Sequence, residues 1–179
     1  MLCCLDVDYR SDSVVAAAVC FDDWTSEFPT RQYSVTSNSP PEPYEPGNFY
    51  RRELPYLLAV FAQVGEQPAT ILIDGFVWLG TDQAGLGAHL YEALGSRSAV
   101  VGVAKRPFRD SSVGAPLLRG TSTRPLYVTS VGISLADAVA GVKAMHGPHR
   151  IPTLLKRVDR LCRALDENDA NGPNRPHAG

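Results

Sequence analysis

The stretch Thr70-Ile71-Leu72-Ile73-Asp74-Gly75 joins a short apolar run to a carboxylate and a glycine. A run of this length with two β-branched isoleucines is typical of a buried β-strand. Ligands of open α/β sheets bind beyond the carboxyl ends of such strands, which is where Asp74 would stand. Asp-Gly is also a common turn dipeptide. We therefore predict a buried strand here, with Asp74 either at a functional site or starting a plain turn.

The residues before this stretch predict three antiparallel strands, at 2–9, 14–21 and 31–36, separated by short polar turns. Together they would form a meander. The first strand has apolar residues on both faces, as central strands do. Asp6 and Asp8 share one of these faces, because side chains alternate along a strand. A buried carboxylate is costly unless it is paired or binds a metal, so both acids are candidates for a functional site.

Residues 37–47 contain four prolines, which exclude a helix. They predict a stiff loop that is either a plain connector or a mount for Tyr44, an aromatic ring that could stack on a ligand or base. Residues 48–64 carry a helical apolar stripe. The stripe places Glu53 on the core-facing side, where it is a functional carboxylate or only a capping acid. Pro55 either kinks this helix or marks its first turn.

Helices and strands alternate after Gly75. The pattern predicts a short helix at 86–94 and a strand at 98–105. That strand ends in Lys105, which is a charge at a site or a solvated end charge. Later segments predict a hairpin, a helix capped by Ser134 and Asp137, and a last helix with an apolar stripe over residues 154–165.

The composition of the 179 residues is that of a globular protein, with 44% apolar and 20% charged residues. We expect one domain at residues 1–165 and a disordered polar tail at 166–179. The net charge of −2 gives no global signal for nucleic acid. The chain has no apolar run long enough for a membrane span and no signal-peptide pattern. The four cysteines lack metal-site spacing, so we expect reduced thiols in a cytoplasmic protein, which we take to be a monomer.

Three carboxylates, Asp6, Glu53 and Asp74, are placed to converge at one site. Hard divalent cations such as Mg²⁺ bind several carboxylate oxygens. Such ions polarise a phosphate and activate water. Lys105 beside them could offset the charge that builds up on the phosphate. Three antiparallel strands followed by alternating helices and parallel strands also suggest an α/β fold with a ribonuclease-H-like mixed sheet.

The local motifs are more specific than the fold, because their order and spacing resemble those of the endonuclease V family. A first strand with Asp6 is followed by a PYxPG element at residues 43–47 and an R-E-x-P element at residues 52–55. Next come a strand ending in Asp74-Gly75 and G-V-A-K at residues 102–105. The resemblance extends to about residue 165.

This resemblance implies a metal-dependent endonuclease that acts near inosine or deoxyinosine in DNA or RNA, cutting at the second phosphodiester on the 3′ side. Asp6, Glu53 and Asp74 would hold Mg²⁺, or Mn²⁺ as an alternative. Lys105 would stabilise the phosphate charge. Tyr44 would be a wedge at the lesion, and the other nucleic-acid contacts implied by the family are Pro43, Pro46, Gly75 and Gly102.

The chain also departs from the family pattern. Gly80 stands where the family has a histidine, and Val131-Gly132 replaces a Gly-His pair. These differences support an alternative in which the protein binds nucleic acid or a protein partner and has weak or no cleavage activity. A third hypothesis is a metal nuclease with a changed base preference.

Overall fold

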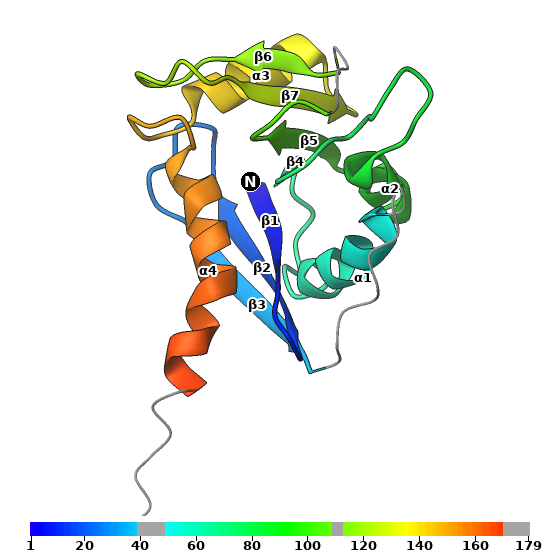
Figure 1. Ribbon diagram of the computed structural model, residues 1–179, viewed down its shortest axis with the longest axis vertical. Helices are drawn as coiled ribbons and strands as arrows, with labels where there is room; N and C mark the ends of the chain where they lie inside the picture. The colour runs from blue at the N-terminus through cyan, green and yellow to red at the C-terminus, as the bar shows by residue number, and fades with distance from the viewer. Residues whose placement is uncertain (39–48, 109–112, 170–179) are drawn as a thin grey trace, which may run out of the picture.

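The computed structural model describes residues 1–38, 49–108 and 113–169 (Figure 1). Its strands form one seven-stranded sheet in the order β3-β2-β1-β4-β5-β7-β6. The strands are β1 Leu2–Tyr9, β2 Val14–Phe21, β3 Arg31–Ser37, β4 Thr70–Ile73, β5 Ala99–Ala104, β6 Ala115–Leu117 and β7 Leu126–Val131. The helices are α1 Phe49–Phe61, α2 Leu86–Ala93, α3 Leu135–Ala144 and α4 Thr153–Asp169.

The predicted meander is confirmed, because β2 pairs antiparallel with both β1 and β3. On its other side β1 pairs parallel with β4, which pairs parallel with β5. The expected series of parallel strands ends there, since β7 runs antiparallel to β5. A parallel return needs a long crossover, usually a helix. In the described residues between β5 and β7 there is no helix, and β6 and β7 form the predicted hairpin instead.

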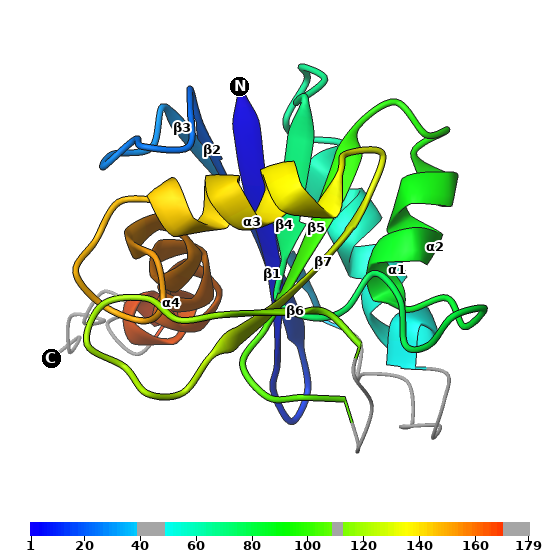
Figure 2. The same ribbon diagram turned by 90° about the horizontal axis from the view of Figure 1, so that it is seen from above.

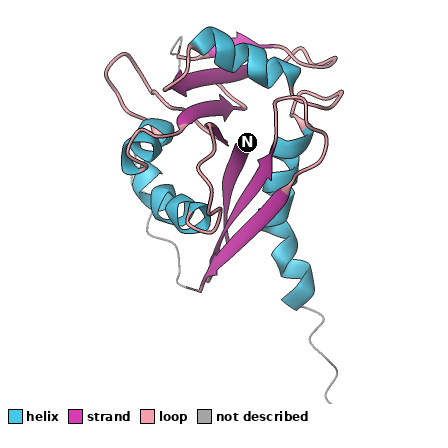
Figure 3. Cartoon of the chain, turned by 180° about the vertical axis from the view of Figure 1, so that it is seen from behind, coloured by secondary structure: helices cyan, strands magenta, loops and turns pink. Residues whose placement is uncertain are grey.

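Helices cover both faces of the sheet (Figures 2 and 3). The helices α1 and α2 pack on one face, in a core that includes Cys3 and Leu5 of β1. The helices α3 and α4 pack on the other, in a core that includes Leu2 and Cys4. Because side chains alternate along a strand, Asp6, two residues after Cys4, lies on the face that α4 covers. The fold therefore directs a carboxylate of β1, an interior strand of the sheet, toward α4.

Several local predictions can be compared directly with the structure. Pro55 lies inside α1, so it does not mark the first turn of that helix. Ser134 caps α3 as expected, because its side chain accepts a hydrogen bond from the backbone N–H of Asp137. Helix α4 continues to Asp169, and residues 170–179 lie outside the described residues, so the domain boundary and the tail stay predictions. In the described parts of the chain, no helix has the length and apolar character that crossing a membrane requires.

Candidate active site

Two oppositely charged side chains meet where neighbouring parallel strands end. Asp74 follows β4 directly, and Lys105 follows β5 directly. Because the two strands are adjacent and parallel, their carboxyl ends lie at the same edge of the sheet. The Lys105 Nζ lies 2.6 Å from Asp74 Oδ2, and both side chains remain partly exposed to solvent. Asp74 therefore stands at the sheet edge that α/β proteins use for ligands.

Asp6 reaches the same edge from β1. Leu5 is the register partner of Ile73, so Asp6 lies beside Asp74, at the point of β1 where its pairing with β4 ends. Glu53 approaches from α1. All three acids and Lys105 line one cavity of about 300 Å³. The structure thus brings together the four residues that the sequence analysis selected as catalytic.

Burial and mutual repulsion act on the acids of this cavity. Burial raises the pKa of Asp6 to about 7, and the nearby charge of Asp74 adds to the effect. Burial likewise raises the pKa of Glu53 to about 8, with further contributions from Asp6 and Asp74. Burial pulls the pKa of Lys105 down, but its hydrogen bond to Asp74 and the surrounding carboxylates outweigh this and raise it. Without a metal, the cavity therefore favours the protonated forms of Asp6 and Glu53, and a bound cation would favour their charged forms.

The donor chemistry of the cavity fits a hard divalent cation, since such ions prefer carboxylate oxygens. The geometry is open, however. Within the described ranges, no three Asp, Glu, His or Cys side chains are close enough together to enclose a metal ion. Lys105 supplies the positive charge next to Asp74 instead. Cation binding thus requires the side chains around the cavity to close and Lys105 to shift its contact.

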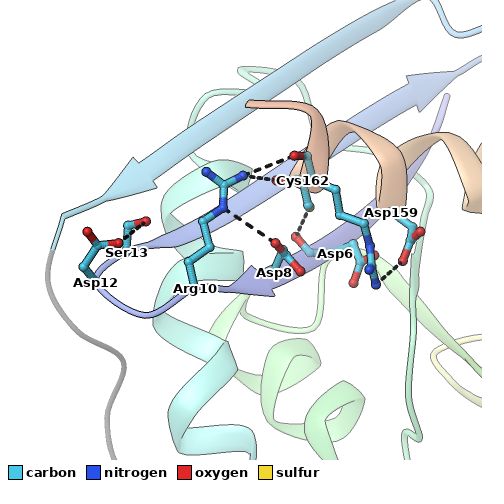
Figure 4. A network of polar contacts seen from close by, with 8 residues as sticks. Asp6, Asp8, Arg10, Asp12, Ser13, Asp159 and Cys162 are labelled. Atoms are coloured by element: carbon cyan, nitrogen blue, oxygen red, sulfur yellow. Dashed lines mark hydrogen bonds and ion pairs between the residues drawn. The ribbon is translucent and has the colours of Figure 1, made fainter. Parts of the chain in front are cut away.

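Helix α4 contributes two further charged residues to this cavity, Asp159 and Arg163. Asp159 lines the 300 Å³ cavity and a neighbouring one of about 20 Å³ that also contains Asp6 and Asp74. Arg163 pairs with Asp159 at 3.3 Å. Figure 4 shows Asp159 on α4 next to Asp6 and Asp8 of β1. Asp159 interrupts the apolar stripe of α4 one turn after Leu155, and an acid on a core-facing stripe was the signal available in the sequence.

Gly102 has a packing role in the structure. A Cβ atom at this position would lie 2.5 Å from the carbonyl oxygen of Gly75 and 2.7 Å from Thr129 Oγ1. The same Thr129 hydroxyl accepts a hydrogen bond from the backbone N–H of Val77. Gly102 therefore leaves room for the chain as it departs from β4 beside Asp74. Contact of Gly75 and Gly102 with nucleic acid remains a prediction.

We expect Gly102→Ala to destabilise the protein by about 1–3 kcal/mol, because the added methyl group overpacks a backbone contact. Urea unfolding at fixed pH measures the change. Gly80→Ala is the matched control, since its new Cβ would come no closer than 3.7 Å to another residue. Gly80 is partly exposed, and substitutions away from packed contacts usually change stability by less than about 0.5 kcal/mol. Equal unfolding midpoints for the two variants would contradict the packing role of Gly102.

The site geometry agrees with the sequence family. Residues 1–116 match the family model described as Endonuclease V. The chain belongs to the endonuclease V family. An endonuclease V of Streptomyces avermitilis is 34% identical over an alignment covering 93% of this chain and 81% of the relative. The crystal structure of the catalytic domain of human endonuclease V has a TM-score of 0.76 and 26% identity, covering 96% of this chain and 84% of the human one.

A third endonuclease V structure shares the fold at lower identity. The protein from Ciona intestinalis, solved in complex with a 24mer DNA containing an inosine followed by a ribo-adenosine, has a TM-score of 0.78 and 18% identity. The alignment covers 94% of this chain and 86% of the Ciona intestinalis chain. The ribonuclease-H-like mixed sheet expected from the sequence is thereby confirmed. As a member of the endonuclease V family, the chain is a nuclease.

One departure from the family pattern, Gly132, has a structural reason. Gly132 has a φ of 77°, and a Cβ atom there would lie 2.9 Å from the ring of Tyr91. Backbone conformation and packing thus both favour glycine at this position. The predicted strand-separating element, with Pro43, Tyr44 and Pro46, lies outside the described residues.

The raised pKa values predict that the stability of the metal-free protein falls as pH rises from about 4 to about 8. Over this range the folded protein holds protons on Asp6 and Glu53 that the unfolded chain has released. Asp6→Asn removes one of these titrations. We expect it to be more stable than wild type by about 4 kcal/mol at pH 8, and the gain to vanish near pH 4.

Chemical denaturation with a chelator present, repeated across this pH range, measures the effect. Asp22→Asn is the control, because Asp22 is exposed on the turn after β2. Parallel pH profiles for wild type and Asp6→Asn would contradict the raised pKa of Asp6.

Proposed function

We propose that this protein is a Mg²⁺-dependent endonuclease, with Mn²⁺ as an alternative ion, that hydrolyses a phosphodiester near inosine or deoxyinosine in DNA or RNA. The observation that carries the proposal is the convergence of Asp6, Glu53, Asp74 and Lys105 on one cavity. Membership of the endonuclease V family supports the same chemistry. The base preference is supported by the relative from Ciona intestinalis, which was solved on inosine-containing DNA.

Each residue has a distinct role in this proposal. Asp6, Glu53 and Asp74 would hold the cation, and Asp8 and Asp159 add two further carboxylates at the same cavity. The bound cation would polarise the scissile phosphate and activate a water molecule. Lys105, which is partly exposed beside Asp74, would donate a hydrogen bond to a phosphate oxygen and offset its developing negative charge.

We also propose that Tyr44 is the wedge that separates the strands at the lesion, with Pro43 and Pro46 stiffening its segment. A rigid aromatic can replace the stacking that an unstacked base loses. The four cysteines are free and buried, as expected in a reducing compartment, so we assign the protein to the cytoplasm. We take the active species to be a monomer.

A second candidate function is a nucleic-acid-binding protein that has lost turnover. It is favoured by Gly80 and Gly132, which replace histidines of the family pattern. The open arrangement of the carboxylates in the described residues also fits this alternative. It predicts the same strand binding as the enzyme, without cleavage.

One experiment separates the two candidates. Purified protein is incubated with end-labelled strands that contain either inosine or adenine at one position, as DNA and as RNA, with and without Mg²⁺. The endonuclease hypothesis requires Mg²⁺-dependent products from the inosine strands. Asp6→Asn, prepared in parallel, should give none. Binding of inosine strands without products at any concentration of Mg²⁺ or Mn²⁺ would favour the second candidate.

A further inference from the structure

A second cavity, of about 360 Å³, lies outside the candidate active site, between α4, β3 and the loop that precedes α4. Its cationic lining consists of Lys156, Arg157 and Arg160 of α4, with the imidazole of His149 from the loop. No acidic side chain of the described residues lines it. We call this cavity the basic groove. In a protein with a net charge of −2, such a concentration of cations is a local feature and not a general property of the surface.

The cations of the basic groove differ in how they are held. Arg157 Nε donates a hydrogen bond to Gln32 Oε1 at 2.7 Å, which fixes one wall of the groove to β3. Lys156 and Arg160 are exposed, and their charged groups make no hydrogen bond or ion pair with any part of the chain that the structure describes. By contrast, Arg163 on the same helix is paired with Asp159. Lys156 and Arg160 are therefore available to an anionic ligand.

The basic groove is adjacent to the candidate active site across a single helix. Asp159 and Arg163 of α4 line the catalytic cavity, whereas Lys156 and Arg160 line the groove. Ile151 lines both the groove and the small cavity beside Asp6. A helix with its side chains is about 10–12 Å wide. A nucleic-acid strand advances about 3.4 Å per nucleotide, so roughly four nucleotides would span α4.

We propose that the basic groove binds backbone phosphates of the same nucleic-acid strand that is cut at the carboxylate cavity, several nucleotides from the cleaved bond. The proposal rests on the proposed function, since it extends the path of that substrate. Lys156 and Arg160 make the phosphate contacts, while Arg157, held by Gln32, shapes the wall. Charge complementarity is the basis of this assignment, because a phosphate backbone is a continuous row of negative charges.

The test compares Lys156→Ala/Arg160→Ala with Lys143→Ala/Arg124→Ala, which removes one lysine and one arginine from exposed positions outside the groove. Affinity for a labelled single-stranded inosine oligonucleotide is measured without added metal over a series of salt concentrations. Each lost phosphate contact lowers the slope of log K against log salt by about 0.7 for a single strand. The groove variant should therefore lose about 1.4 from the slope and about 20-fold in affinity at 0.1 M salt. The control variant should keep the slope of wild type.

The position of the groove is tested with strands trimmed on either side of the inosine. One of the two flanks should reach the basic groove. When that flank is shorter than about four nucleotides, wild type and the groove variant should have equal affinities. Trimming the opposite flank should leave the difference in affinity between the two proteins unchanged. Equal slopes for wild type and the groove variant on the full strand would overturn the proposal. Polyglutamate serves as a second labelled probe. The proposal would also be overturned if the groove variant lost affinity for polyglutamate alone, which would identify an acidic polypeptide as the ligand.

These outcomes are separable from those of the proposed function. Binding is measured under conditions without cleavage. If wild type cleaves no strand but its salt slope still differs from that of the groove variant, the endonuclease hypothesis is refuted and phosphate binding at the basic groove is supported. An active wild type whose slope equals that of the groove variant refutes the groove and leaves the endonuclease standing. Circular dichroism melting of all three proteins verifies that each variant is folded.

Discussion

Asp74→Asn is expected to lower the single-turnover rate of strand cleavage by about 10³-fold or more, while substrate affinity stays at least as high as that of wild type. Asparagine keeps the shape of the side chain but removes a charged oxygen ligand. A divalent cation supplies several kcal/mol of charge stabilisation, and each 1.36 kcal/mol corresponds to a factor of about ten in rate. Affinity does not fall, because the substitution also removes a negative charge that faces the phosphate.

The measurement uses enzyme in excess over a labelled inosine strand at saturating Mg²⁺, with affinity determined separately in the presence of a chelator. Asp22→Asn is the charge-matched control on an exposed turn away from the cavity. It should cleave at the rate of wild type. If Asp74→Asn preparations cleaved as fast as wild type, the activity would come from a contaminating nuclease and the assignment of Asp74 would be wrong.

Lys105→Ala is expected to lower the single-turnover rate by about 10²–10³-fold, the usual loss when one donor to a developing oxyanion is removed. In the free protein Lys105 pairs with Asp74, so its ammonium group is already held at the edge of the cavity. The effect on binding should be smaller than the effect on rate, because the negative charge on the phosphate builds up in the transition state. Rates at saturating protein concentration, compared with dissociation constants, separate the two effects.

Arg106→Ala provides a close control, since Arg106 is the next residue along the chain and is exposed. Its cleavage rate should match that of wild type. Lys105→Arg keeps the charge and should recover part of the lost rate. A wild-type rate for Lys105→Ala at saturating protein would show that Lys105 only attracts the strand.

Much of the site was predictable because its signals are local. Alternation along β1 places Asp6 on one face, and the boundary between Ile73 and Asp74 marks the end of a buried strand. The spacing of apolar residues in α1 turns Glu53 inward. These patterns depend on the backbone geometry of one strand or helix, so they can be recognised without knowledge of the partners. The order of the motifs then identified the family.

The sequence alone determined which segments are strands and helices, which residues face inward, and the endonuclease V family of the chain. Only the tertiary structure decided that β7 runs antiparallel, that Lys105 pairs with Asp74, and that Asp159 joins the carboxylates. It also placed Lys156 and Arg160 in a groove beside the same site. These features depend on which distant segments pack together. The pairing of distant strands and helices depends on how the whole core is buried. The periodicity of apolar residues within one segment therefore does not predict it.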